Sequence, residues 1–205
     1  MSLCKSTSLA RRHLLETSLL GALPLAACSV LPERPYQERR EWPLEARRPA
    51  QTPARPGAPV LLLRAVRAGP GLDARGLRKR LPDGAEHLDY WEEWAVPPPQ
   101  AIEDNLRQWL AASGRFTAVT MPGSQVVPDL VIEAELTSLL ADLPAHEARA
   151  TMLVVVTRGP AAAYRPLRQM TLTGTAPLGG QSGAALAAAM SAAVVALMGE
   201  VERAV

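Results

Sequence analysis

Cysteine, histidine and aromatic residues are scarce in this chain of 205 residues, and each scarcity excludes a class of structure or function. The 2 cysteines are Cys4 and Cys28, so no disulfide and no free thiol can form beyond residue 28. Among the 3 histidines, His146 precedes a glutamate but has no second histidine at the spacing of an H-E-x-x-H zinc site. Aromatic residues make up 4% of the chain, so a folded core must be built mainly from Leu, Val, Ala and Ile.

Catalytic motifs are also missing. The stretch Gly179-Gly180-Gln181-Ser182-Gly183 lacks the Gly-x-Ser-x-Gly register of a nucleophile elbow. The loop from Gly174 has no lysine where a P-loop needs one to reach phosphates. Glu133 and Glu135 share one face of an expected strand, which is usual for the solvated side of a sheet. We therefore predict a protein that is not an enzyme and uses no cofactor or metal; a hydrolase with a widely spaced triad is the alternative.

The stretch Leu25-Ala26-Ala27-Cys28 has the pattern of a bacterial lipobox, in which a peptidase cuts before a cysteine that carries a diacylglycerol. A basic region and then an apolar region, residues 18–27, precede the cysteine in the order of a signal peptide. We predict that residues 1–27 are a lipoprotein signal peptide and that Cys28 is lipidated. The alternative is an ordinary leader cut near an unmodified Cys28.

The leader and the residue after Cys28 suggest where the protein goes. Arg11-Arg12 resembles a twin-arginine export signal, although ordinary Sec leaders also contain adjacent arginines. The apolar stretch is shorter than the roughly 20 residues of a membrane-spanning helix, so attachment would be by lipid alone. Ser29, where an aspartate would favour the inner membrane, favours the outer membrane. We predict a lipid anchor on the periplasmic face of the outer membrane.

Charge argues against nucleic acid as a partner. The formal net charge of the whole chain is +2. Lys5, Arg11 and Arg12 leave with the leader and Glu16 is the acid that leaves with them, so the mature chain is close to neutral. No basic footprint for nucleic acid remains after processing.

The mature chain divides by composition. Residues 28–59 are rich in proline and charge, so we predict an extended stalk. Tyr36, Trp42 and Leu44 are apolar exceptions that either dock on the domain or a partner, or are simple linker residues. Residues 60–205 are long enough for one domain with its own core.

Hydrophobic periodicity predicts a chain of strands with two long helices. One helix opens after Pro97-Pro98-Pro99, ends at Ser113-Gly114, and has Ile102, Leu106, Trp109 and Leu110 along one stripe. The other is rich in alanine and runs from an N-cap at Ser182 to about Arg203. The expected strands cover residues 60–66, 87–94, 116–121, 129–137, 150–157 and 167–174.

The densest basic cluster of the mature chain lies in residues 73–79 and just after. Its members are Arg75, Arg78, Lys79 and Arg80. We predict a short helical turn here, whose basic residues form a solvated face; a patch that binds phosphate or lipid headgroups is the alternative.

The run from His87 to Trp94 holds three of the chain's aromatic residues. On a regular strand Tyr90, Glu92 and Trp94 would share one face, with Trp91 and Glu93 on the other. Large amphipathic rings are favoured as interface anchors. The aromatic residues would therefore either contact a partner or pack under the following helix.

Taken together, these features resemble the ABC-type transport auxiliary lipoprotein family, the lipoprotein partner of MCE-type (Mla- and Pqi-like) lipid transport systems. The features are the lipobox, the stalk, the strand at residues 60–66, the Tyr90-Trp91-Glu92-Glu93-Trp94 segment before an amphipathic helix, the acidic strand at residues 129–137 and the Ala-rich last helix. The resemblance implies an α/β domain with a small mixed sheet flanked by helices, similar to the N-terminal domain of TolB.

The resemblance also implies a role without catalysis. The lipoprotein would dock on the periplasmic MCE protein, which carries phospholipid or another apolar molecule, while a separate permease and ATPase complete the system. We predict that Tyr90, Trp91 and Trp94 contribute to this docking. The alternative is an outer-membrane lipoprotein that plugs or activates an envelope-assembly or cell-wall synthesis machine. The sequence leaves oligomerisation open.

Overall fold

In the computed structural model of the protein, residues 36–159 and 165–205 are described. The chain divides into two units, Met1–Gln37 and Glu38–Val205, and every described helix and strand lies in the second. The predicted signal peptide and Cys28, with the first part of the predicted stalk, lie outside the described residues.

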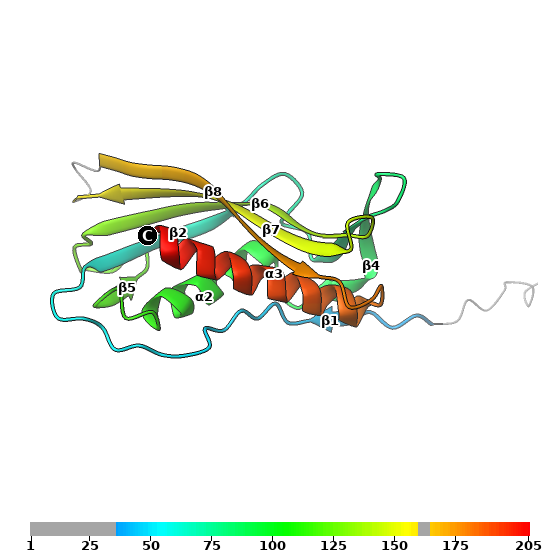
Figure 1. Ribbon diagram of the computed structural model, residues 1–205, viewed down its shortest axis with the longest axis horizontal. Coiled ribbons are helices and arrows are strands. Elements are labelled where there is room, and N and C mark those ends of the chain that lie inside the picture. Colours follow the sequence, from blue (N-terminus) through cyan, green and yellow to red (C-terminus); the bar gives the residue numbers. More distant parts are fainter. Residues whose placement is uncertain (1–35, 160–164) are drawn as a thin grey trace, which may run out of the picture. The chain divides into compact units, whose positions relative to one another are not determined.

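The described strands form one mixed eight-stranded sheet (Figure 1). The strands are β1 (Arg40–Trp42), β2 (Val60–Ala68), β3 (Gly76–Arg80), β4 (Glu86–Trp94), β5 (Ala118–Thr120), β6 (Leu130–Asp142), β7 (Glu147–Arg158) and β8 (Arg165–Pro177). β6 is central: it pairs with β2 and with the end of β3 in parallel, and with β7 in antiparallel orientation. β8 continues the sheet beyond β7, and β4 and β1 continue it beyond β3. The predicted α/β class with a mixed sheet is confirmed.

Alternation along β7 shows that one face of the sheet is covered. Every second residue of this strand is buried, and the residues between them are partly or largely exposed. The buried residues are Ala148, Ala150, Met152, Val154 and Val156. A strand with a period of two places these side chains on a single face, which therefore faces the core.

The two described helices, α2 (Pro98–Ala111) and α3 (Gly183–Ala204), contribute to the same core as the covered face of the sheet (Figure 1). α2 has no side-chain cap and starts with prolines, which suit a position whose N–H needs no helical partner. At the N-cap of α3, Ser182 Oγ accepts a hydrogen bond from Ala185 N at 3.3 Å. The predicted apolar stripes of both helices are buried, so both helix predictions are confirmed.

α3 packs unusually close to the sheet at Gly174 of β8. A Cβ atom at this glycine would lie 2.2 Å from Ala193 O and 2.2 Å from Leu197 N of the helix. α3 is long and apolar enough to cross a membrane by length and composition, but half of its most apolar window is buried inside the domain. Its small residues therefore serve close packing on the sheet.

From Arg40 onward, the segment that composition predicts to be a stalk belongs to the folded domain. β1 pairs in parallel with β4, with Trp42 opposite Trp94, and Leu44 and Ala46 are buried in the core. The domain thus begins before the predicted boundary at residue 60. Proline-rich composition did not reveal this, because the segment is held by tertiary contacts and not by its own regular structure.

Asn105 of α2 is one of those contacts. Its side-chain amide donates to Leu44 O at 2.8 Å and accepts from Ala46 N at 3.0 Å, as a neighbouring strand would. Further along, Thr52 N donates to Ala112 O at 2.9 Å. These bonds satisfy backbone groups of a segment that lies outside the sheet after β1.

The predicted helical turn at residues 73–79 is wrong, since Gly76–Arg80 form strand β3. β3 pairs antiparallel with β4 and ends beside β6. Leu77 is buried, while Arg78, Lys79 and Arg80 are partly exposed. Charge density alone had suggested a solvated helix, but pairing with β4 fixes the extended conformation.

Candidate partner-binding site

A wide bulge in β4 forms the candidate site. Gly76 of β3 lies opposite Glu93 and Arg78 lies opposite Leu88. Residues 89–92 of β4 therefore face the single residue Leu77 on β3. A bulge of this kind leaves residues unpaired and re-aims their side chains. It breaks the face alternation that the sequence predicts for this strand.

Asp89 fixes the conformation of the bulge. Its Oδ1 accepts hydrogen bonds from Trp91 N at 2.9 Å and Glu92 N at 3.2 Å, and its Oδ2 lies 3.2 Å from Lys79 Nζ. Burial raises the pKa of this carboxyl group, but the backbone hydrogen bonds and Lys79 outweigh burial, so its pKa lies below the ordinary value. The aspartate is therefore ionised and holds the bulge at neutral pH.

Tyr90 and Trp91 project from the bulge as an aromatic ledge. They are 65% and 37% exposed, and their rings meet edge to face with centroids 4.9 Å apart. The guanidinium carbon of Arg39 lies 4.4 Å from the centre of the Tyr90 ring, which is cation–π geometry. The ledge is thus held in place before any partner binds.

Trp94 does not belong to this ledge. It is 1% exposed and contributes to the hydrophobic core. Its backbone N donates to Arg75 O at 2.7 Å, which returns the chain to regular pairing after the bulge. The prediction that Trp94 contacts a partner is therefore wrong for the folded domain. On a regular strand Trp94 and Tyr90 would share a face, but across the bulge Trp94 is buried and Tyr90 is exposed.

The basic cluster of β3 is neutralised by acids of neighbouring strands. Arg78 lies 3.1 Å from Glu86, and Arg80 lies 2.9 Å from Asp142. Arg75 contacts Glu41 at 2.6 Å and donates its Nε to Trp94 O at 2.7 Å. Arg78 and Arg80 lie on β3 and Arg75 directly precedes it, and all three charges are paired. These residues therefore do not form a solvated helix face.

The described ranges, 36–159 and 165–205, contain no candidate metal-binding site. Within them, no three or more His, Cys, Asp or Glu side chains cluster closely enough to hold a metal ion. Glu133 lies on the outer face of β6, where it pairs with Arg64.

Sequence reasoning missed Asp89 and Arg39 as parts of the site. An aspartate inside a strand pattern is a recognisable signal, because Asp is depleted in regular strands and bonds readily to backbone N–H groups two or three residues ahead. Arg39 gave no such signal, since it comes from the segment that composition predicts to be a stalk. Its position depends on the pairing of β1 with β4.

Comparison with known proteins gives the family. A model of the ABC-type transport auxiliary lipoprotein component matches residues 43–202. The chain belongs to this family. It is an auxiliary lipoprotein of an ABC-type transport system, and membership of a lipoprotein family implies a location in the cell envelope. No curated protein matches the chain by sequence.

Two solved structures share the fold. The crystal structure of protein XCC0632 from Xanthomonas campestris is 20% identical, with a TM-score of 0.63 over 80% of this chain and 92% of that one. The crystal structure of a protein described as uncharacterized is 10% identical, with a TM-score of 0.62 over 82% of this chain and 98% of that one. At these identities the two structures show a common fold and no more.

Proposed function

We propose that this auxiliary lipoprotein is anchored to the outer membrane through lipidated Cys28 and docks, without catalysis, on the periplasmic MCE protein of a lipid transport system. The observation that carries the proposal is the aromatic ledge. Tyr90 and Trp91 are exposed and their rings contact each other edge to face, and aromatic residues of this kind are frequent anchors at protein interfaces. The energy source would be the separate ATPase of the system, reached through its permease.

Charged groups around the ledge would orient the partner. Glu41, Arg39 and Arg40 come from β1 and the residue before it, next to the bulge. Arg39 lies 3.6 Å from Glu93, and Arg40 lies 3.8 Å from Glu92. Pairs of both signs around apolar rings give a polar rim to an apolar centre, as interfaces have.

Co-purification with the MCE protein of the same system tests the docking. We expect the double variant Tyr90→Ala/Trp91→Ala to bind at least about tenfold more weakly, because the loss of aromatic anchors costs 2 kcal/mol or more at interface centres. Met121→Ala is the control, since Met121 is an exposed apolar residue outside the bulge. Unchanged binding by a folded double variant would remove the ledge from the interface.

The same preparation tests the anchor and the alternative function. Mass spectrometry of protein extracted from membranes should find a triacylated Cys28 at the N-terminus. Recovery of a cell-wall enzyme in place of an MCE protein would instead favour the role of activating or plugging an envelope machine.

A further inference from the structure

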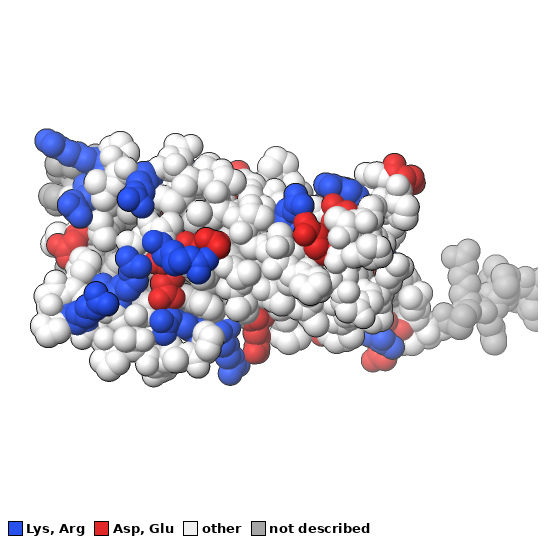
Figure 2. Space-filling view, viewed as in Figure 1, with Lys and Arg blue, Asp and Glu red and all other residues white. Residues whose placement is uncertain are grey.

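A cationic hollow lies near the last turn of α3 and the start of β2. One part has a volume of about 850 Å³ and is lined by Arg48, Arg55, Arg115, Arg158 and Glu202, among others. A second part, of about 330 Å³, shares Arg115 and Arg158 with the first and extends to Arg168. In Figure 2 basic side chains predominate over acidic ones on the visible face of this region.

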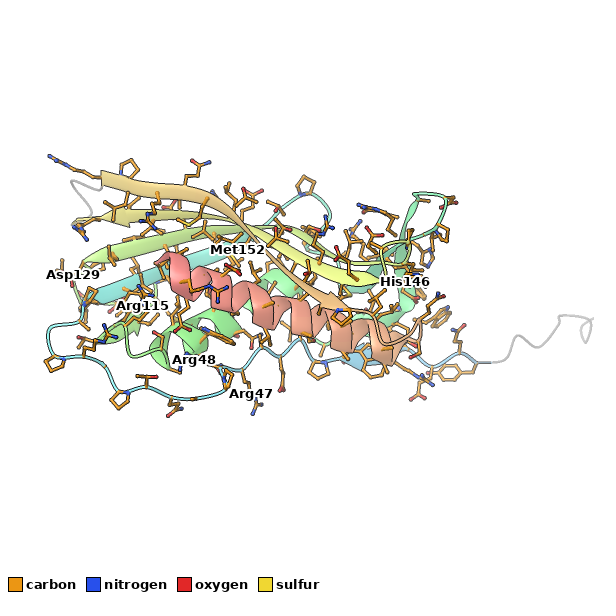
Figure 3. The ribbon with its side chains drawn as sticks, viewed as in Figure 1. Arg47, Arg48, Arg115, Asp129, His146 and Met152 are labelled. Atoms are coloured by element: carbon orange, nitrogen blue, oxygen red, sulfur yellow. The ribbon has the colours of Figure 1, made fainter. Side chains whose placement is uncertain are left out.

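Ion pairing differs between the two ends of the domain. Six arginines form no ion pair with any carboxylate of the described residues: Arg55, Arg67, Arg115, Arg158, Arg165 and Arg168. All but Arg67 lie in or beside this hollow, and we call these five the arginine end. Figure 3 places Arg115 and Asp129 toward this end and His146 toward the other. Basic residues near β3 and β4, by contrast, are matched by acids.

Two of these arginines face each other across strands. Arg158 of β7 is the direct antiparallel partner of Arg165 of β8. Like charges directly opposite in a sheet destabilise it, and no described carboxylate pairs with either of them. A bound anion between these strands would relieve the repulsion.

Exposed apolar side chains lie beside these arginines, of which Arg115 and Arg168 donate hydrogen bonds to the last carbonyl groups of α3. Val127, in the loop before β6, is 71% exposed and lines a hollow together with Arg158. Val126 next to it is 50% exposed, and Leu167 of β8 is 46% exposed and lines the hollow of Arg168. Cations beside exposed apolar groups suit a ligand with an anionic layer and an apolar layer next to it.

We propose that the arginine end docks on a membrane surface of anionic phospholipid. The guanidinium groups bind lipid phosphates, which they match in charge and hydrogen-bonding geometry, while Val126, Val127 and Leu167 enter the interfacial layer. An acidic protein segment would match the charge but would leave these three apolar side chains in water. This proposal goes beyond docking on an MCE protein and does not depend on it.

Sedimentation with lipid vesicles tests the proposal. The probe is the full chain carrying Cys28→Ala, so that no acyl chain is attached, with vesicles of phosphatidylcholine alone or mixed with phosphatidylglycerol. We expect binding to the mixed vesicles, weakening as salt is added. Arg158→Glu/Arg165→Glu should bind about 25-fold more weakly, at roughly fivefold for each basic residue near an anionic surface.

The control variant makes the same change of charge elsewhere. Arg67→Glu/Arg149→Glu alters one arginine of β2 and one of β7 away from the hollow, and it should bind within about twofold of the parent. The comparison is repeated with residues 1–27 removed, because a basic and apolar leader that bound the vesicles by itself would mask the loss. A Val127→Ser/Leu167→Ser variant should also bind more weakly, without a change in salt dependence.

Three results would overturn the proposal. They are no difference between the two kinds of vesicle, equal losses in the arginine-end and control variants, and capture of a polyglutamate peptide with no binding to vesicles. The last result would assign the arginine end to an acidic protein partner. None of these measurements involves an MCE protein, so failure here leaves the docking proposal untouched.

Discussion

Trp109 donates its indole Nε1–H to Glu202 Oε2 at 2.6 Å, and Arg48 Nε donates to the same oxygen at 3.0 Å. One carboxylate thereby joins α2, α3 and the segment between β1 and β2. Arg48 Nη2 also lies 3.2 Å from Oε1, so the guanidinium binds the carboxylate through two bonds. This junction ties the proline-rich segment to the C-terminal helix.

Glu202→Gln should destabilise the domain by about 1–3 kcal/mol, because hydrogen bonds to charged groups contribute that much and Arg48 would lose its counter-charge. Urea unfolding followed by tryptophan fluorescence measures the change. Glu200→Gln is the control, since Glu200 pairs with Arg203 of the same helix at the surface and should change stability by less than about 0.5 kcal/mol. Equal effects of the two substitutions would contradict the role of the junction.

The junction should also make stability depend on pH below 4.5. Burial raises the pKa of Glu202, but hydrogen bonds from Arg48 and Trp109 and the charges of Arg48 and Arg115 outweigh it, so the pKa lies below 4.5. A group with a lowered folded pKa contributes stability fully above its unfolded pKa and loses it as pH falls through the folded value. The difference in unfolding free energy between the wild type and Glu202→Gln should therefore be constant above pH 4.5 and shrink below it. If this difference in unfolding free energy instead grew as the pH fell, the pKa of Glu202 would be raised in the folded protein.

Asn105→Ala should release the segment around Leu44 and Ala46. Two hydrogen bonds to the backbone of this segment are lost, at a cost of about 1–3 kcal/mol. Limited digestion with trypsin measures the release, because Arg47 and Arg48 lie next to these contacts. We expect faster cleavage there in Asn105→Ala and unchanged cleavage in Asp104→Ala, whose side chain bonds to Arg107 on the surface. Rapid cleavage of the wild type at these arginines would instead support the predicted extended stalk over a segment packed on the domain.

Gly174→Ala should cost about 1–3 kcal/mol or more, as overpacking does, because the new methyl group would meet backbone atoms of α3. Thermal unfolding measures the loss. Gly179→Ala provides the control, since no atom lies within 4 Å of a Cβ there. If the two variants melt together, α3 does not pack as closely on β8 as the structure shows.

Periodicity predicted most of the fold. Strands β2 and β4–β8 and both described helices have apolar patterns that identify them, and the stripe from Ile102 to Leu110 is buried as expected. β1 could not be found, because three residues form no pattern and their pairing with β4 is a tertiary event. β3 was missed for a related reason: the acids that stabilise its basic residues come from β4 and β6.

The site was only partly predictable. Tyr90 and Trp91 were identified by type, and they are exposed, but their orientation depends on the bulge fixed by Asp89. Trp94 was placed wrongly, because period-two reasoning assumes an unbroken strand. The arginine end was not found at all, since its members are far apart in sequence and converge through the sheet.

The attachment of residues 40–59 to the domain limits how far the protein can reach. Under the proposed lipid anchor at Cys28, ten residues, 29–38, separate the anchor from Arg39, which already contacts the domain, and ten residues span at most about 36 Å. A tether that continued to residue 59 would have spanned about 110 Å. Under that proposal the domain stays close to its own bilayer, and a component anchored in the opposite membrane would have to cross most of the intervening space itself.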